Sequence, residues 1–375
     1  MDNAQFLSQK LLFMCARLDS ADVDAHQLQQ LLPEIKDWQA ILNRLEENGL
    51  APLFYSHITH HSLSSIDSTT SLALKALVLR HQSVSKARYQ AIQELHEALD
   101  NESIPWIALK GLALASSLYL EVGQRPMRDM DILVPKQDLS RVASIMRSLD
   151  YELPEEQPSR YMKGTHQLPN AEKIINGFTI SVEIHHNAIS QDAYDSLRFE
   201  DVVESTKDVQ WGDLSIPVLS NELMLHQLCR HLEALHPGGN LKLVNVIDVV
   251  SFAEKNIASL NWQLISNQYP HVLNTLRCLN YIIPLNPELS SIVNVQRQPV
   301  LQGVGQIMLP LSTIFNARSS QSEKMRWLFN PPDWWLHLYY GVNPRHKLLF
   351  VKCVRHPLRL CQWAFNRLIS RLLGG

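Results

Sequence analysis

Two aspartates, Asp129 and Asp131, lie two positions apart at the start of the apolar run Ile132-Leu133-Val134. In a β-strand, residues i and i+2 point to the same face and lie about 7 Å apart along the chain. Two carboxylates on one buried face repel each other unless they are solvated, hydrogen-bonded or neutralised by a metal ion. The pair therefore predicts a site at which both aspartates bind one divalent cation or two adjacent ones.

A third acidic residue lies in the segment 179–185, where polar and aliphatic residues alternate strictly. This alternation is typical of a β-strand, and it puts Glu183 and His185 together on the polar face. Such a strand can present Glu183 and His185 to a cleft while its aliphatic face packs against helices. From the alternation alone, a solvent-facing strand with an incidental glutamate is the simpler interpretation.

The segments that must position these residues change in pattern along the chain. Apolar residues recur at helical spacing in residues 5–60 and 70–100, and again from Ser220 onward. Between these regions, short apolar runs alternate with helical patterns, and mixed strand and loop signals follow over residues 150–190. We expect strands at 106–109 and 130–134, helices at 112–120 and 136–149, and proline breaks at Pro331-Pro332, Pro344 and Pro357.

This order of elements favours a small α/β or α+β catalytic unit between helical flanks. We predict an N-terminal helical region over residues 1–100, a catalytic core over 101–205, and a C-terminal helical domain over 206–375. The core is expected to contain a small mixed β-sheet, so the predicted fold class is α+β.

The composition excludes several classes of protein. The chain has 375 residues, 45% of them hydrophobic, and a formal net charge of -3. It therefore lacks the global positive charge of nucleic-acid binders, and we expect no extended nucleic-acid template. Its five cysteines are scattered without metal-ligand spacing, which favours a reducing cytoplasm. No signal peptide or apolar run of about 18 residues is evident, so no membrane span is expected.

The C-terminal segment is basic and amphipathic. No acidic residue follows Asp333, whereas seven lysines and arginines do, interleaved with leucine, phenylalanine and tryptophan. The simplest interpretation is a terminal helix or helix pair with a solvated basic face. Weak contact with a membrane surface is an alternative, and the protein would then be membrane-peripheral. An anionic substrate or partner is a third possibility.

The motifs together resemble the bacterial nucleotidyltransferase-like family of the polymerase-β-type nucleotidyltransferase superfamily. The resemblance covers roughly residues 5–255 and is most specific over 104–135. It rests on Leu109-Lys110-Gly111, Arg125, Arg128-Asp129-Met130-Asp131-Ile132-Leu133-Val134 and Val182-Glu183-Ile184-His185. The superfamily pattern is a strand ending in glycine, a helix, a strand bearing Asp-x-Asp, and a later strand bearing a third carboxylate. Here Gly111 is followed by Leu112 rather than Gly or Ser, and 17 residues separate Gly111 from Asp129.

The resemblance implies transfer of a nucleoside monophosphate from a nucleoside triphosphate to an acceptor hydroxyl, with Mg²⁺ or Mn²⁺ as cofactor. It assigns the metal to Asp129 and Asp131, which would hold both ions of a two-metal site. Glu183 would complete the site that holds the acceptor hydroxyl and assist its deprotonation. Gly111 would let backbone N–H groups approach the triphosphate.

Several basic residues are candidates for contact with the nucleotide. Lys110, Arg125 and Arg128 can counter phosphate charge, and His185 shares the face of Glu183. Each has a structural alternative. Lys110 and Arg125 can be solvated surface residues, and Arg128 can form an ion pair with one of the two aspartates.

Other residues give weaker signals. His166 and Asp248 can each face the cleft or have a purely structural or surface role, and Asp248 lies among apolar residues in a predicted helix. His231 and His236 have no carboxylate nearby at a suitable spacing, so we do not predict a metal site there.

The leading hypothesis is thus a metal-dependent nucleotidyltransferase whose acceptor is a small molecule, a polymer end or a protein. The rival hypothesis is a catalytically inactive nucleotide-binding or regulatory protein that retains the fold. The altered glycine turn is compatible with the rival. Neither the base of the nucleotide nor the acceptor follows from these motifs.

Overall fold

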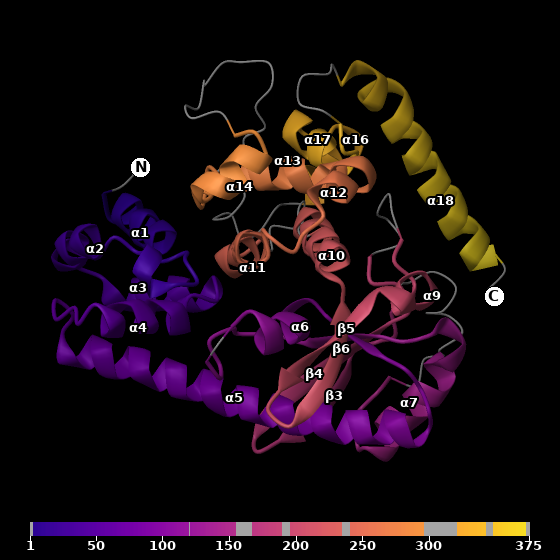
Figure 1. Ribbon diagram of the computed structural model, residues 1–375, viewed down its shortest axis with the longest axis horizontal. Helices are drawn as coiled ribbons and strands as arrows, with labels where there is room; N and C mark the ends of the chain where they lie inside the picture. The colour runs from indigo at the N-terminus through magenta and orange to yellow at the C-terminus, as the bar shows by residue number, and fades with distance from the viewer. Residues whose placement is uncertain are drawn as a thin grey trace.

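The structure is a computed structural model of the chain (Figure 1). It contains a mixed β-sheet, and helices precede and follow the strands in the sequence. The fold class is therefore α+β, as predicted. The residues that it describes are 3–119, 121–154, 167–189, 196–234, 241–295, 321–342 and 348–372.

Helices fill the N-terminal region, as the apolar spacing predicts. They are α1 (Asn3–Met14), α2 (Ala25–Leu31), α3 (Trp38–Glu47), α4 (Ala51–His60) and the long α5 (Ser68–Asn101). Aspartates cap three of them, because Asp24, Asp37 and Asp67 each accept a backbone N–H from the first turn at 2.9 Å. The first four helices pack together at one end of α5, which then runs beneath the sheet (Figure 1).

The sheet of the described residues has six strands in the order β3-β4-β2-β1-β6-β5. The strands are β1 (Ile107–Leu109), β2 (Met130–Leu133), β3 (Ala171–Ile175), β4 (Phe178–His185), β5 (Thr206–Trp211) and β6 (Leu214–Leu219). Strands β2 and β4 are parallel neighbours, as are β1 and β6, whereas the other pairs are antiparallel. The three strands predicted within 101–190 thus lie side by side at the centre of the sheet.

The two faces of the sheet differ in character. The face bearing Ile180, Val182 and Ile184 is fully buried, and α5 packs against β4. Lys173 of β3, which is paired with Ile180, reaches Glu94 of α5 at 2.8 Å and so confirms that α5 covers this face. Helices α6 (Lys110–Ser117) and α10 (Asn221–Ala234) pack against β5 and β6, while α7 (Leu139–Ser148) packs beside α5. The polar face of β4 is thereby left for a site.

The region after the sheet is helical in the described residues. It contains α11 (Leu243–Lys255), α12 (Trp262–Gln268), α13 (Pro270–Leu279), α14 (Pro287–Ile292), α16 (Gln321–Phe329), α17 (Asp333–Tyr339) and α18 (His356–Leu372). Short α9 (Phe199–Val202) precedes β5, and 3-10 turns occur at Ser20–Asp22, Leu32–Glu34, Lys136–Asp138 and Val203–Ser205. None of the described helices combines the length and the apolarity needed to cross a bilayer.

Two expectations need correction. The sheet continues to Leu219 through β5 and β6, so the strands do not end at the predicted boundary after residue 205. The division into three domains stays a prediction, and an end of the core after Leu219 fits the sheet better. Pro357 does not break its helix, because a π-helical turn, Val351–Arg355, leads directly into α18. Pro344 lies outside the described residues.

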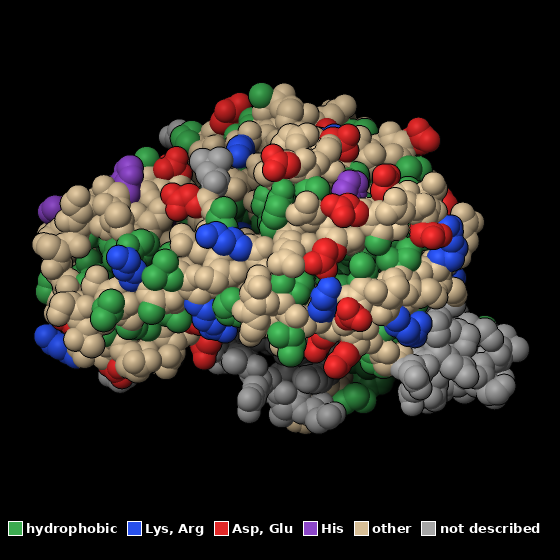
Figure 2. Space-filling view, turned by 90° about the horizontal axis from the view of Figure 1, so that it is seen from below, with side chains coloured by type: hydrophobic (Ala, Val, Ile, Leu, Met, Phe, Trp, Pro, Cys, Tyr) green, Lys and Arg blue, Asp and Glu red, His purple; other side chains and the backbone are tan. Residues whose placement is uncertain are grey.

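Charged side chains of both signs are spread over the α5 side of the molecule. Acidic and basic side chains are interspersed there among small apolar areas (Figure 2). No continuous basic strip crosses the described part of that face.

The loop before β2 crosses α5 at a glycine. Gly123 has a φ of +80°, and a Cβ there would lie 2.7 Å from the backbone nitrogen of Gln82 in α5. Side chains are strained at such a φ, and a helix backbone cannot move aside. The loop that leads to Asp129 is therefore held against α5 only because residue 123 is glycine.

Substitution of Gly123 by alanine is expected to destabilise the protein more than the same change at Gly177. Both glycines have a φ near +80°, but a Cβ at Gly177 meets nothing within 4 Å. Gly177→Ala should cost about 1–2 kcal/mol from backbone strain alone. Gly123→Ala should cost a further 1–3 kcal/mol from the clash. Urea unfolding of both variants measures the difference, and equal losses would contradict the close contact with α5.

Candidate active site

The central strands bring one row of polar side chains together. The register pairs Leu109 of β1 with Asp131 of β2, and Asp131 with Glu183 of β4. Directly paired residues on neighbouring strands point to the same face. The predicted neighbours Asp131 and Glu183 therefore lie side by side on the face that α5 does not cover.

His185 joins this row as a partner of Asp131. Its imidazole Nε2 lies 2.8 Å from Asp131 Oδ1 and 3.5 Å from Glu183 Oε2. Both His185 and Asp131 are buried, whereas Glu183 is partly exposed. Oxygen or nitrogen atoms of the three side chains lie within 4.8 Å of one another. His185 thus shares the polar face of β4 with Glu183, as predicted, and it is buried beside Asp131.

This set of side chains fits a divalent cation. Two carboxylates are the ligands that Mg²⁺ and Mn²⁺ prefer, and an imidazole either binds a metal directly or orients a carboxylate by a hydrogen bond. The 2.8 Å separation is a hydrogen bond between His185 Nε2 and Asp131 Oδ1, so His185 here orients a carboxylate and does not offer a free ligand atom. The partly exposed Glu183 leaves the cluster accessible from solvent.

Asp129 lies just before β2 and outside this cluster of three residues. Within the described residues, its carboxylate has no hydrogen bond or ion pair. Burial raises the pKa of Asp129 to about 6, and the nearby carboxylates of Asp131 and Glu183 contribute to the increase. The nearby positive charges of Lys110 and Arg128 compensate the Asp129 carboxylate only in part, and a bound cation would complete the compensation.

Asp131 is compensated by Lys110 instead. The Lys110 ammonium Nζ lies 2.5 Å from the same Oδ1 that contacts His185. Burial alone would raise the pKa of Asp131, but the charge of Lys110 and the hydrogen bond from His185 hold it well below its usual range. Burial likewise opposes the charge of Lys110, yet Asp131 raises the pKa of this lysine above its ordinary value. Lys110 is thus part of the site and not a solvated surface residue.

The turn between β1 and α6 has its left-handed residue at Lys110, with a φ of 46°. A Cβ on Gly111 would lie 3.1 Å from the side chain of Met127 and 3.5 Å from Arg125 Nη1. The loop before β2 therefore packs closely on Gly111, and a larger residue there would require the Met127 side chain to shift.

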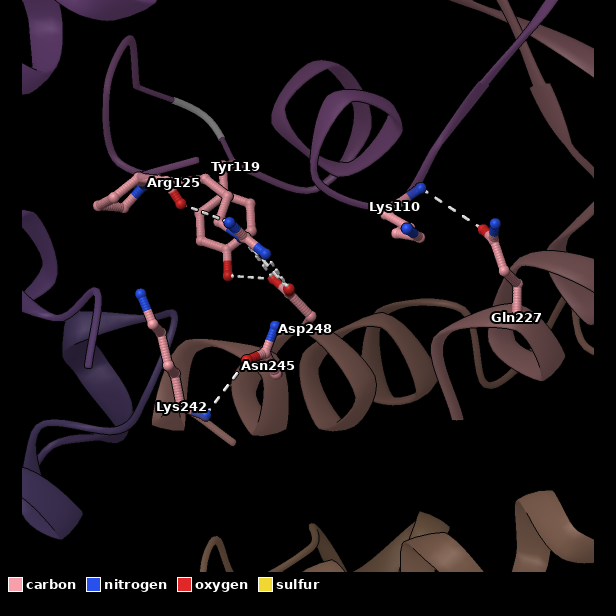
Figure 3. Close-up of polar contacts among 8 residues, drawn as sticks. Lys110, Tyr119, Arg125, Gln227, Lys242, Asn245 and Asp248 are labelled. Atoms are coloured by element: carbon pink, nitrogen blue, oxygen red, sulfur yellow. Dashed lines mark hydrogen bonds and ion pairs between the residues drawn. The ribbon is translucent and has the colours of Figure 1, made fainter. Parts of the chain in front are cut away.

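Arg125 is buried in that loop and is not a solvated residue. Its guanidinium donates to both oxygens of Asp248 in α11, with Nη2 2.6 Å from Oδ2. It also donates to the backbone carbonyl of Pro126. The hydroxyl of Tyr119 donates to Asp248 Oδ1 at 2.7 Å, so two side chains converge on one carboxylate (Figure 3). Burial would lower the pKa of Arg125, but Asp248 holds it above its ordinary value.

Arg128, the other predicted arginine, is exposed. It makes no ion pair with a described residue, so the predicted pair with Asp129 or Asp131 is absent from this part of the chain. The charge of Arg128 nevertheless acts on Asp129 and lowers its pKa, against the larger effect of burial. Arg128 is therefore close to the carboxylates and available to a ligand. His166 lies outside the described residues.

Three residues near the site were not predicted. Gln227 of α10 accepts a hydrogen bond from the backbone N–H of Lys110 at 3.4 Å (Figure 3). His231 lies one turn further along α10, and the charges of Lys110 and Asp131 act on its pKa. Burial lowers the pKa of His231 to about 3, so it is neutral at pH 7. Arg88 of α5 donates to the backbone carbonyl of Met127 at 2.5 Å. All three lie within helices, where neither spacing nor composition marks them as site residues.

The comparisons with known proteins agree with this geometry. The model of a family described as uncharacterised nucleotidyltransferases matches residues 34–285, and the chain belongs to that family. The matched segment contains every residue of the cluster described above. The family defines the chain as a transferase of the nucleotidyltransferase class. No curated protein sequence matches the chain.

Two solved structures resemble the chain with low sequence identity and low TM-scores. One is the solution structure of the antibiotic-resistance factor ANT(2'')-Ia, with 13% identity over 47% of this chain and 86% of that chain, and a TM-score of 0.34. The other is an antigenic nucleotidyltransferase-like protein from Paracoccidioides brasiliensis, with 14% identity over 58% and 93% of the two chains, and a TM-score of 0.36. TM-scores this low carry no argument about the substrates of this chain.

Proposed function

We propose that the protein transfers a nucleoside monophosphate from a nucleoside triphosphate to an acceptor hydroxyl, with a divalent cation as cofactor. The observation that carries the proposal is the row formed by Asp131 and Glu183 on parallel strands, with His185 hydrogen-bonded to Asp131. Asp129 lies just before β2, where burial and the neighbouring carboxylates raise its pKa. Three carboxylates gathered this closely are costly unless cations balance them.

The proposed cofactor is Mg²⁺ or Mn²⁺, held by Asp131, Glu183 and Asp129. When bound, such cations activate the attacking hydroxyl and neutralise charge on the leaving pyrophosphate. Glu183 is the most exposed of the clustered carboxylates, so it is suited to accept the proton of the acceptor hydroxyl. His185 holds Asp131 in place by its hydrogen bond and so orients a metal ligand.

The basic residues supply charge for the triphosphate. Lys110 lies at the start of α6 beside the carboxylates, and Arg128 is exposed next to Asp129. Gly111, in the first turn of α6, remains the proposed point at which backbone N–H groups approach the phosphates. Arg125 is engaged by Asp248, so its proposed contribution to nucleotide binding is to position the loop that carries Arg128 and Asp129.

The acceptor surface is proposed to come from the helices after the sheet. Gln227 and His231 of α10 border the carboxylates on that side. The acceptor class remains a hydroxyl of a small molecule, a polymer end or a protein.

Labelled nucleotides test the proposal. The purified chain is incubated with each nucleoside triphosphate labelled at the α-phosphate, with Mg²⁺ or Mn²⁺ and a cell extract as the source of acceptor. We expect one labelled product that requires the cation and is absent with an Asp131→Asn variant. Failure of every nucleotide to label any product would reject the transferase reaction.

His185→Ala is expected to lower the affinity for the metal more than it lowers the stability of the fold. Loss of a residue that orients a metal ligand typically costs 10–100-fold in metal affinity or activity. We therefore expect the Mg²⁺ concentration for half-maximal transfer to rise about tenfold or more. His96→Ala is the matched control, because His96 contacts Trp106 and lies away from the carboxylates. If the Mg²⁺ concentration for half-maximal transfer is unchanged in His185→Ala, His185 does not orient a metal ligand.

One observation favours a second candidate, a protein that binds nucleotide without transferring it. The ammonium of Lys110 forms an ion pair with the Oδ1 atom of Asp131, the atom that a metal cation would otherwise bind. If Lys110 does not leave that atom, the nucleotide binds but no pyrophosphate forms. Calorimetric binding of a nucleoside triphosphate together with zero pyrophosphate release from any acceptor would identify this candidate.

A further inference from the structure

Between residues 348 and 365, the described side chains form one face attached to the protein and one bare, solvent-exposed face. Leu348 and Val351 join Leu336 and Tyr340 of the α17 region in a small core that is separate from the main one. The buried imidazole of His356 strengthens the attachment, because its two nitrogens contact the hydroxyl of Tyr340 at 2.9 Å and the carbonyl of Leu328 at 2.8 Å. The start of the segment is thus anchored to the α17 region, and α18 lies at the edge of the molecule (Figure 1).

The bare face carries large apolar side chains at intervals of three or four residues. Each of them is exposed, and they are Phe350, Val354, Leu358, Cys361 and Phe365. Phe350, Leu358 and Phe365 are 65%, 64% and 60% exposed, and Leu349 beside them is 71% exposed. Single exposed apolar residues are common on protein surfaces. A continuous row of them along one helix instead indicates a surface that binds a membrane or another protein.

The charges that accompany this row are mostly basic, and one of the basic residues, Lys352, is ion-paired with Asp333. After Asp333 the chain contains seven lysines and arginines and no acidic residue, whereas the whole chain has a net charge of -3. The preceding part therefore carries about -10. Among the described side chains, Arg355 and Arg359 stack over the rings of Tyr340 and Tyr339 at 5.1 and 5.0 Å. The aromatic rings thus fix both guanidinium groups beside the apolar row.

We propose that the segment 348–372 is an interfacial helix that binds the surface of an anionic lipid bilayer. A helix with exposed phenylalanine and leucine on one face and basic residues along its sides inserts its apolar face at the level of the headgroups. The basic residues then lie near anionic lipid, which attracts each of them. A second copy of the chain is a poorer occupant, because two such helices bring the same basic charges together.

Vesicle flotation with the full chain tests the proposal independently of any enzymatic activity. The vesicles are phosphatidylcholine alone, or phosphatidylcholine with 30% phosphatidylserine, in 0.1 M salt. We expect the protein to float with the anionic vesicles and to remain at the bottom with the neutral ones. Raising the salt to 0.5 M should reduce the bound fraction several-fold, because screening weakens the attraction.

A matched pair of variants assigns the binding to this face. Phe350→Gln combined with Leu358→Gln should lower the bound fraction about tenfold or more. Leu72→Gln removes a leucine that is 70% exposed on α5, and it should leave the binding unchanged. Thermal melting checks that both proteins remain folded, which is expected because the substituted residues are exposed.

Three results would overturn the proposal. The wild-type chain could fail to float with anionic vesicles, or the double variant could float as well as the wild type. The third is concentration-dependent dimerisation in analytical ultracentrifugation that the double variant abolishes, since the bare face would then bind a second copy. A failure of nucleotidyl transfer has no bearing on these results, so the two proposals fail separately.

Discussion

Replacing Asp131 by asparagine is expected to lower the rate of nucleotidyl transfer about 10³-fold or more. Asp131 is buried at the centre of the cluster, where its Oδ1 atom contacts both Lys110 and His185. A bound cation stabilises the transition state by several kcal/mol, and each 1.36 kcal/mol corresponds to a factor of ten in rate. The rate of pyrophosphate release, measured at saturating metal and nucleotide, gives the size of the loss.

The same substitution should also lower the stability, because it leaves the buried Lys110 ammonium without a charged partner. Removing one partner of a buried ion pair commonly costs about 3–5 kcal/mol. The activity must therefore be measured at a temperature where melting shows the variant to be folded. Asp208→Asn is the matched control, since Asp208 is an exposed aspartate on β5 of the same sheet and should retain full activity. A folded Asp131→Asn variant with wild-type transfer would reject the proposed metal site.

Substitution of Asp248 by alanine is expected to destabilise the protein by about 3–5 kcal/mol. The carboxylate receives hydrogen bonds from the guanidinium of Arg125 and the hydroxyl of Tyr119, and all three side chains are buried or nearly so. Without Asp248, the positive charge of Arg125 has no partner in a place with little water. The free energy of unfolding, from urea titration, measures the effect. A loss below about 1 kcal/mol would show that water or another group compensates Arg125.

The double variant Arg125→Met with Asp248→Leu separates two roles of Arg125. Apolar residues of similar volume often replace a buried ion pair with little loss of stability. We therefore expect the double variant to recover most of the stability that Asp248→Ala loses. If Arg125 only positions the loop before Asp129, the double variant also retains transfer within about tenfold. A stable double variant without transfer would instead support direct contact between Arg125 and the phosphates.

The parts of the site that local patterns determine could be predicted from the sequence. The strict alternation around Glu183 indicates a strand with one polar face, and the structure confirms it in β4. The alternation also puts His185 on the face of Glu183. The apolar run after Asp131 similarly indicates the buried strand β2. β4 shows a clear two-residue period, whereas β2 is marked by its short and fully buried run.

Contacts between distant segments could not be predicted in this way. The parallel pairing that puts Asp131 beside Glu183 joins residues far apart in the sequence. The ion pair between Arg125 and Asp248 spans 123 positions, and nothing near either residue specifies the other. Arg88 and His231 lie on regular helices, where only the packing decides which side chain faces the site. The hairpin β5–β6 did carry a local signal, because Gly212-Asp213 lies between two alternating segments.

The conformation of the turn after β1 shows a different limit. Lys110 adopts a left-handed conformation there, although no glycine marks this position in the sequence. The close packing of the loop before β2 on Gly111 is likewise a contact that the local sequence does not specify. Strain at a lysine that also holds Asp131 is typical of a functional position.

The most direct test of the proposed reaction compares two labels in one nucleotide. The purified chain is given a nucleoside triphosphate labelled at the α-phosphate or at the γ-phosphate, with Mg²⁺ and the acceptor found in the extract. Nucleotidyl transfer predicts that the acceptor gains the α label, that the γ label leaves as pyrophosphate, and that Asp131→Asn does neither. Transfer of the γ label to the acceptor, or labelling that persists in Asp131→Asn, would contradict the proposed function.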